Sequence, residues 1–327
     1  MCAERATISQ IVNIGSETVQ GAAVVAATRL TGLGFSMGVK TGIRSYRAAG
    51  YKYGATSSLN QEWAEGTFEG PLTYNELAYL LCGAVKNVTP SGAGADKTWT
   101  FSPSSTAEDT VKTFTIEQGS AVRAQRFAYG LITGLNMSFG PNGADVTAPV
   151  MGKAIEDAVT LNASPAEVAL VPITRPQVSV KLAATAAGLT AASKLERPIR
   201  VDWNLSDRFG PVWALNESTD WAAHVEVEPK LEVKLLMQAD AAGMGPLANL
   251  RANTTTFMRI EAVGPVIGAG PATNKLTVDT ALRVSGDPSE WRDEDGVYAI
   301  EWTMNAFHDV TWAKAFNVIL INGLAAL

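Results

Sequence analysis

The stretch FAYGLITGLNMSFGPNGADVTAPVMG, residues 127–152, decides the expected fold. Its first part places large apolar side chains on one face of an extended chain: Phe127, Tyr129, Leu131, Leu135, Met137 and Phe139. Small or polar residues alternate with them, as the period of two in a β-strand requires. GPNG has the composition of a turn, and ADVTAPVMG reads as the returning strand. We therefore expect a long hairpin with one face toward a core and the other toward water.

A second two-faced hairpin is expected from KLTVDTALRVS (275–285) and VYAIEWTMNAF (297–307). The residues predicted to face the core are Leu276, Val278, Leu282, Val284, Tyr298, Ile300, Trp302 and Met304. The residues predicted to face away are Lys275, Thr277, Asp279, Arg283, Ser285, Ala299, Glu301, Thr303 and Asn305. The chain is thus predicted to be mainly β.

Each half of the chain follows the same order of predicted elements: strand, helix, short strands, then a long hairpin. In the first half, Thr73 and Glu76 form a capping box before an apolar stripe at helical spacing. We expect an N-terminal arm (1–50), a first domain (51–160), a linker (161–200) and a second domain (201–327). The repeated order predicts a tandem duplication, although the residues of the two halves barely match.

The charge and the cysteines limit the class of protein. The formal net charge is −6, and Lys and Arg form no block, so a nucleic-acid-binding footprint is not expected. Cys2 and Cys82 are interpreted as free thiols. The N-terminus lacks a signal-peptide pattern, which predicts a soluble cytosolic product without a membrane anchor.

Motifs for catalysis or metal binding fail on their context. His224 and His308 lack partners at metal-ligand spacing. The acidic run before Gly296 would place Trp291 and Trp302 at the ligand positions of a calcium loop. Gly34 to Gly38 spells GxSxG around Ser36, but its surroundings are glycine- and β-rich rather than α/β. We expect no enzyme activity and no cofactor.

The away-facing residues of the hairpins suggest a use. If several copies lay side by side, their strand edges would pair and close a barrel around water. The residues predicted to face this lumen are Asp145, Asp279, Arg283, Glu301, Thr303 and Asn305. Carboxylates among small residues would let DNA slide without sticking. An ordinary β-sandwich with one solvated face fits the same alternation equally well.

Several blocks of the sequence resemble the major tail tube proteins of siphophages, the phages with long non-contractile tails. NIGSETVQGAAVVAATRL (13–30) resembles the N-terminal signature of that family, and SLNQEWAEGTFEGPLTYNELAYLL (58–81) its strand leading into a helix. Residues 206–216, 222–244 and 293–327 are similar to its later blocks. The order of the blocks carries more weight than any one of them.

The resemblance implies a tail-tube-type β-sandwich or barrel with a flanking short helix and long hairpins. It also implies rings stacked around a DNA channel in the virion tail, assembled in the bacterial cytoplasm. Two tube-like halves favour a ring trimer with pseudo-six-fold symmetry, and a hexamer is the alternative. The expected partners are the tail terminator, distal tail and tape measure proteins, with DNA passing through without specific binding.

The arm, the C-terminal segment and the loop at 285–296 would bridge neighbouring subunits or rings. The loop residues expected at this contact are Asp287, Glu290, Trp291, Arg292, Asp293, Glu294 and Asp295. A capsid decoration protein or a carbohydrate-binding module is the alternative function, because eight tryptophans could supply a sugar-stacking surface.

Overall fold

The computed structural model describes residues 7–120, 122–215 and 218–327, and it is mainly β, as expected. The helices are α1 (Leu77–Ala84) and α2 (Pro246–Ala252), with short 3₁₀ turns at Thr7–Ser9, Arg175–Gln177 and Ala187–Thr190. The first half contains β1 (Ile11–Ser16), β2 (Thr28–Leu30), β3 (Gly34–Tyr46), β4 (Thr56–Pro71), β5 (Lys97–Phe101), β6 (Phe114–Gly119), β7 (Ala124–Ile132), β8 (Leu135–Gly140), β9 (Gly143–Gly152), β10 (Glu156–Val159) and β11 (Ala166–Glu167). The second half contains β12 (Val178–Ala183), β13 (Pro198–Ser206), β14 (Phe209–Val212), β15 (Ala223–Glu226), β16 (Lys230–Gln238), β17 (Thr256–Val266), β18 (Thr273–Val284), β19 (Arg292–Glu294), β20 (Val297–Ala306) and β21 (Phe316–Asn322).

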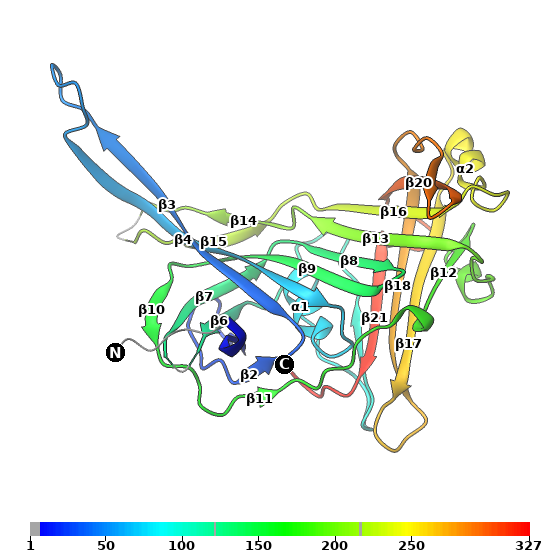
Figure 1. Cartoon of the computed structure of the whole chain (residues 1–327), viewed down its shortest axis with the longest axis horizontal. Coiled ribbons are helices and arrows are strands. Elements are labelled where there is room, and N and C mark those ends of the chain that lie inside the picture. Colours follow the sequence, from blue (N-terminus) through cyan, green and yellow to red (C-terminus); the bar gives the residue numbers. More distant parts are fainter. Residues whose placement is uncertain (1–6, 121, 216–217) are drawn as a thin grey trace.

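One large sheet runs through both halves of the chain (Figure 1). Its strands follow the order β3-β4-β9-β8-β13-β16-β20, and neighbouring strands are antiparallel. The halves meet where β8 pairs with β13, from Leu135 opposite Leu205 to Phe139 opposite Val201. The two halves therefore share a single hydrogen-bonded sheet.

Two further groups of strands, which we call the smaller sheets, form the second layer and join the large sheet through the β7–β9 and β18–β20 pairings. The order β2-β1-β6-β7-β10 covers the first half, and β12-β17-β18-β21-β5 covers the second. One contiguous core lies between the layers and includes Phe68, Trp203 and Trp302 of the large sheet. Trp302 is buried, which confirms its predicted core position, and Trp99 of β5 is buried as well.

The strand pairings recur in the same order in both halves. β1 pairs with β6 as β12 pairs with β17, β3 with β4 as β13 with β16, and β4 with β9 as β16 with β20. The hairpin β6–β7 corresponds to β17–β18. The C-terminal end of β7 pairs with β9, and the C-terminal end of β18 pairs with β20. Finally, β10 pairs with β7 as β21 pairs with β18, and α1 and α2 follow β4 and β16.

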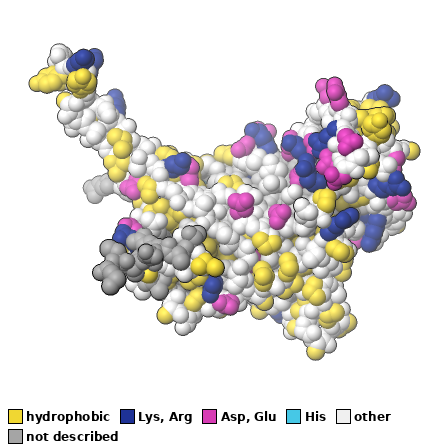
Figure 2. Space-filling view, in the orientation of Figure 1, with side chains coloured by type: hydrophobic (Ala, Val, Ile, Leu, Met, Phe, Trp, Pro, Cys, Tyr) yellow, Lys and Arg dark blue, Asp and Glu magenta, His cyan; other side chains and the backbone are white. Residues whose placement is uncertain are grey.

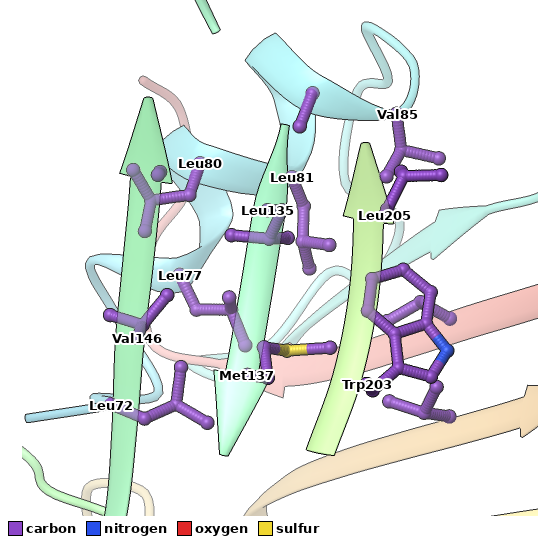
Figure 3. Packing of buried hydrophobic residues seen from close by; sticks show 14 of the residues in the cluster. Leu72, Leu77, Leu80, Leu81, Val85, Leu135, Met137, Val146, Trp203 and Leu205 are labelled. Carbon is purple, nitrogen blue, oxygen red and sulfur yellow. The ribbon is translucent and has the colours of Figure 1, made fainter. Parts of the chain in front are cut away.

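Helix α1 follows the predicted capping box but begins one turn later than expected, at Leu77, with Glu76 and not Thr73 as its N-cap. The Glu76 amide donates to Thr73 Oγ1 (3.2 Å), and that hydroxyl donates to the Glu76 carboxylate (3.1 Å). The carboxylate also accepts the amides of Thr31 and Gly32, so it fixes a distant segment against the helix start. Every side chain of α1 is buried, and Leu77, Leu80 and Leu81 point toward Leu135, Met137 and Val146 of the large sheet (Figure 3).

The start of the expected arm and a strand of the expected linker belong to the folded body, whereas β3, at the end of the expected arm, forms part of a projecting hairpin. Within residues 7–50, β1 is buried, and Glu17 beside it accepts hydrogen bonds from Gly21 N, Thr113 Oγ1, Thr115 Oγ1 and Tyr129 N at 2.8–3.0 Å. The boundary at residue 50 falls at the tip of the β3–β4 hairpin. Within the expected linker, β12 pairs with β17 along six residues. The sequence PQVSVKL (176–182) predicts a strand where β12 lies, whereas the Gly- and Ala-rich composition around β1 concealed that strand, because small residues weaken the signal of alternation.

The predicted single face of 127–139 is wrong at its centre. Tyr129 has a φ of +58°, and the pairing register with β6 shifts beside it, so the alternation changes sides. Phe127 remains in the main core, whereas Tyr129 and Leu131 pack in a second cluster with Phe209 and Trp221. This cluster joins the first half to the β14–β15 hairpin.

We expect Leu80→Ala to lower the free energy of unfolding by about 2–5 kcal/mol, because it leaves a cavity in the main core. Leu215→Ala removes the same atoms from a fully exposed side chain and should change it by less than ~0.5 kcal/mol. Urea denaturation followed by tryptophan fluorescence measures both. Equal midpoints for the two variants would contradict the assigned core.

Candidate functional surface

The outer side of the large sheet is the main polar surface of the fold. Side chains that alternate with the core residues project there from β3 to β20, and we call this surface the polar face. Its members include Lys40, Glu65, Thr67, Glu69, Asn136, Ser138, Asp145, Thr147, Arg200, Asp202, Asn204, Lys230, Glu232, Lys234, Glu301, Thr303 and Asn305. These residues are exposed or half-buried in the single chain.

The polar face is continuous across the junction of the halves. Asp145 lies opposite Ser138, which lies opposite Asp202, and the row continues through Lys234 to Thr303. The Ser138 hydroxyl donates to the Asp202 carboxylate across the β8–β13 pairing. Polar groups from both halves thus form one surface.

Carboxylates outnumber cations on the polar face, where Glu65, Glu69, Asp145, Asp202, Glu232 and Glu301 compare with Lys40, Arg200, Lys230 and Lys234. Arg200 contacts both Asp202 (3.0 Å) and Glu301 (3.2 Å). Arg292 also approaches Glu301, at 3.4 Å. The negative character of Glu301 is therefore partly compensated, whereas Asp145 is exposed.

Four of the six residues predicted to face a lumen lie on the polar face: Asp145, Glu301, Thr303 and Asn305. Asp279 lies on the smaller sheet, is only 7 % exposed, and forms two hydrogen bonds to Arg259 (2.6 and 2.8 Å). Arg283 lies opposite Asn305, but its guanidinium donates to Thr255 and lies over the Phe307 ring. A period of two shows which side of its strand a residue lies on, but not which sheet the strand belongs to. For this reason Asp279 was wrongly predicted to lie beside Glu301.

The outer side of the smaller sheet in the second half is an ion-paired surface. Glu261 contacts Lys275 (2.7 Å) and Lys181 (3.3 Å) beside the Arg259–Asp279 pair. The hydrogen bond from Lys275 lowers the pKa of Glu261, and the hydrogen bond to Asp279 raises the pKa of Arg259. Cations exceed carboxylates in this group, so it differs in charge from the polar face.

The segment 285–296, predicted as an inter-ring loop, runs beside β20. Ser285 and Ser289 donate backbone hydrogen bonds to Thr303 and Glu301, both at 3.1 Å. The predicted contact residues follow along it: Asp287, Glu290, Trp291, Arg292, Asp293, Glu294 and Asp295. The last three belong to β19 and its turn into β20, where Asp295 and Gly296 have positive φ. Trp291 is 60 % exposed and contacts Tyr298.

The large sheet ends in an unpaired edge on each side. At one end β3 pairs only with β4, and at the other the segment 285–294 pairs only with β20, within the described residues. Unpaired strand edges expose backbone donors and acceptors that can pair with another chain. This edge position of β3 was not predicted from the sequence, because glycines at 34, 38 and 42 conceal the alternation of the strand.

The groups considered for catalysis sit in other surroundings. Ser36 lies within β3, opposite Thr67, and not at a turn between a strand and a helix. His224 Nδ1 lies 3.1 Å from the Tyr129 hydroxyl, and burial lowers the pKa of this imidazole. His308 is exposed. Cys82 is a buried free thiol whose pKa burial raises to about 11, and Cys2 lies outside the described residues.

Comparison of the chain with protein-family models and with curated protein sequences finds no match. Among the described residues, no helix combines the length and the apolar character needed to cross a bilayer.

Asp279→Asn should lower the free energy of unfolding by roughly 1–3 kcal/mol, because it leaves the Arg259 guanidinium partly buried without its charged partner. Asp145→Asn makes the same change at an exposed site and should shift it by less than ~0.5 kcal/mol. Chemical denaturation compares the two variants. The assignment of Asp279 to a structural pair fails if both variants behave like the unmodified chain.

Proposed function

We propose that this chain is a tail tube protein of a phage with a long non-contractile tail, and that its copies form stacked rings around a DNA channel. The observation that carries the proposal is the polar face on a single sheet that spans both halves and ends in two unpaired edges. A sheet of this kind closes into a ring when copies join edge to edge, which removes every open edge.

The joint inside the chain supplies a template for the joint between chains. In the order of pairings, β3 corresponds to β13, because β3 pairs with β4 as β13 pairs with β16. The segment 285–294 corresponds to β8, because it pairs with β20 as β8 pairs with β9. Copying the β8–β13 joint would pair β3 of one copy with the segment 285–294 of the next. Such head-to-tail contacts form a ring when the rotation closes. We therefore favour a place within the ring for this segment over the inter-ring bridge expected from sequence.

The proposed ring is a trimer in which two tandemly duplicated units per chain imitate six-fold symmetry. The recurrence of the pairings supports the duplication, and a hexamer is the alternative. The ring partners would be further copies of the chain in the virion tail, with tail terminator, distal tail and tape measure proteins beyond the tube ends. Assembly would occur in the host cytoplasm, without catalysis or a cofactor.

The polar face suits the wall of a DNA conduit. Its excess of carboxylates repels phosphate, and its Ser, Thr and Asn side chains keep the surface hydrated. The alternative of a carbohydrate-binding or capsid decoration protein rests on the exposed Trp291–Tyr298 pair, which could stack on a sugar ring.

Negative-stain microscopy of the purified protein tests the proposal directly. Rings or tubes with an open centre are the expected result, because joined copies enclose the polar face. Discrete monomers at every concentration, together with retention on a glycan column, would favour the alternative.

Asp145→Lys and Glu301→Lys should still assemble but should reduce DNA delivery at least about tenfold, because new cations on the wall would hold the passing phosphates. Glu108→Lys, on an exposed loop before β6, is the matched control and should leave delivery unchanged. Infectivity of particles built with each variant measures the effect. Full infectivity of both polar-face variants would overturn the assignment of this face to the channel.

A further inference from the structure

The β14–β15 hairpin belongs to the second half of the chain and packs against the first half, and we call this contact the clasp. Residues 207–215 and 218–229 leave the large sheet between β13 and β16, and Phe209 and Trp221 among them pack on the first half. The Arg208 guanidinium is 2 % exposed and donates to the carbonyls of Ala84 and Val85 at the end of α1, both at 3.0 Å. It also pairs with Glu226 of the same hairpin.

Aromatic side chains complete this clasp. The Trp221 ring lies 4.1 Å from the Tyr129 ring, and its Nε1 donates to the Gly152 carbonyl (3.1 Å). Trp213 packs edge-on against Trp63 at 5.6 Å. The hairpin therefore covers the outer side of β7 and the end of β9, where the first half would otherwise expose apolar surface.

The β3–β4 hairpin is the counterpart of this connection in the first half. Lys40 pairs with Trp63 at the position where Ser206 pairs with Lys230 in the second half. The chain beyond Lys40 therefore matches the connection that contains β14 and β15. The base of this hairpin contacts the β14–β15 connection of its own chain: the Glu62 amide donates to the Thr219 carbonyl (3.0 Å), and Ile43 lines a pocket with Leu215. Beyond this base the hairpin projects far from the body (Figure 1). Its exposed apolar side chains are Val39, Ile43, Tyr46, Tyr51, Tyr53 and Leu59.

The second half leaves uncovered part of the surface that the β14–β15 hairpin covers in the first half, although Ala281, which matches Tyr129, is buried in a cluster that includes Trp312. At the C-terminal end of β7, Leu131 pairs with Met151 of β9. Arg283, at the C-terminal end of β18, pairs with Asn305 of β20 in the same way, so these two positions match. A pocket of about 720 Å³ lies there between α2 and the start of β17, lined by Pro246, Asn253, Thr255 and Arg283 among others. Phe307 (43 %) and Val310 (86 %) are exposed beyond the end of β20.

The charges of the two surfaces are complementary. Residues 34–61 of the hairpin contain Lys40, Arg44, Arg47 and Lys52 and no carboxylate. The segment 285–296 on the second half contains Asp287, Glu290, Asp293, Glu294 and Asp295 against a single Arg292. Figure 2 shows basic and hydrophobic side chains at the far end of the hairpin. Opposite potentials steer two surfaces together and fix their register.

We propose that the β3–β4 hairpin of one copy docks on the second half of the neighbouring copy in the same ring, over Arg283, Phe307 and Val310. This inference rests on the proposed ring, since the joint of β3 with the segment 285–294 brings the hairpin to that surface. In this contact the β3–β4 hairpin packs on a neighbouring chain in the way that the β14–β15 hairpin packs on the first half of its own chain. Apolar side chains at the tip cover the apolar surface, and the basic residues face the acidic segment.

Cysteine cross-linking tests the contact. Rings of the double variant Ile43→Cys and Phe307→Cys should form disulfide-linked multimers under mild oxidation, visible on a non-reducing gel. The control pair Ile43→Cys and Leu170→Cys places an equally accessible thiol on the first half and should give far less cross-linked product. Each single variant measures the background from the native thiols.

The outcomes separate this inference from the ring itself. Rings that form but do not cross-link would overturn the hairpin contact and leave the proposed function standing. Cross-links found in stacked tubes but not in isolated rings would also overturn it, because they would place the hairpin between rings. A failure of the unmodified chain to assemble would overturn both.

A charge exchange provides a second measurement that needs no cysteine. Arg44→Glu with Arg47→Glu should weaken ring formation several-fold by light scattering, since both residues lie on the exposed hairpin and carry no core contact. Adding Asp293→Lys and Glu294→Lys should restore it. Loss of assembly without this restoration would contradict the proposed pairing of charges.

Discussion

Antiparallel pairing between β8 and β13 is the interaction on which the rest of the structure depends. It satisfies the backbone groups along both strands, and it aligns the alternation of the two halves so that their apolar faces share one core. A slip of one residue would turn Trp203 outward and Asp202 inward. Continuity of the polar face is therefore a direct consequence of this register.

The sequence predicted the parts of the fold that depend on local pattern. Alternation located the hairpin ending at Gly140 and Gly143, and the Thr73–Glu76 box located α1. It did not predict the left-handed Tyr129, which moves Leu131 into a different cluster, because a tyrosine in a strand carries no local signal for positive φ. Pairings between distant strands, such as β12 with β17, also leave no mark in one sequence.

The candidate surface was predictable to the same extent. Asp145, Glu301, Thr303 and Asn305 follow from the period of two, since their strands are single-sided. Asp279 obeys the same rule but lies on another sheet, where Arg259 from the neighbouring strand neutralises it. Which strand lies beside which is a property of the tertiary structure, so ion pairs across strands stay hidden until the fold is known. The same reason hid Arg200, which alternates correctly on β13 yet bridges to Glu301 two strands away.

Buried polar groups tie strands that are distant in the sequence to one another and to α1. Glu17 ties β1 to β6 and β7, and Arg208 ties the end of α1 to β14. Asn322 donates to the Tyr74 carbonyl and accepts from Trp99 Nε1 (both 2.9 Å), which joins the C-terminal strand to the first half. Most of these bonds reach backbone groups, so they constrain geometry and not the identity of the partner residue. Sequence can then change while the pairings persist.

The proposed contacts also account for the contrast between the two hairpins. The β14–β15 hairpin meets its surface as the chain folds, so it can rely on Trp221 and the buried Arg208. In the proposed ring, the β3–β4 hairpin has to stay in water until another copy arrives, and a tip made only of tyrosine and aliphatic side chains would associate without selectivity. Arg44, Arg47 and Lys52 keep the same tip hydrated and direct it toward an acidic partner. A joint inside a chain and a joint between chains can thus share geometry and differ in chemistry, because only the second requires solubility before it forms.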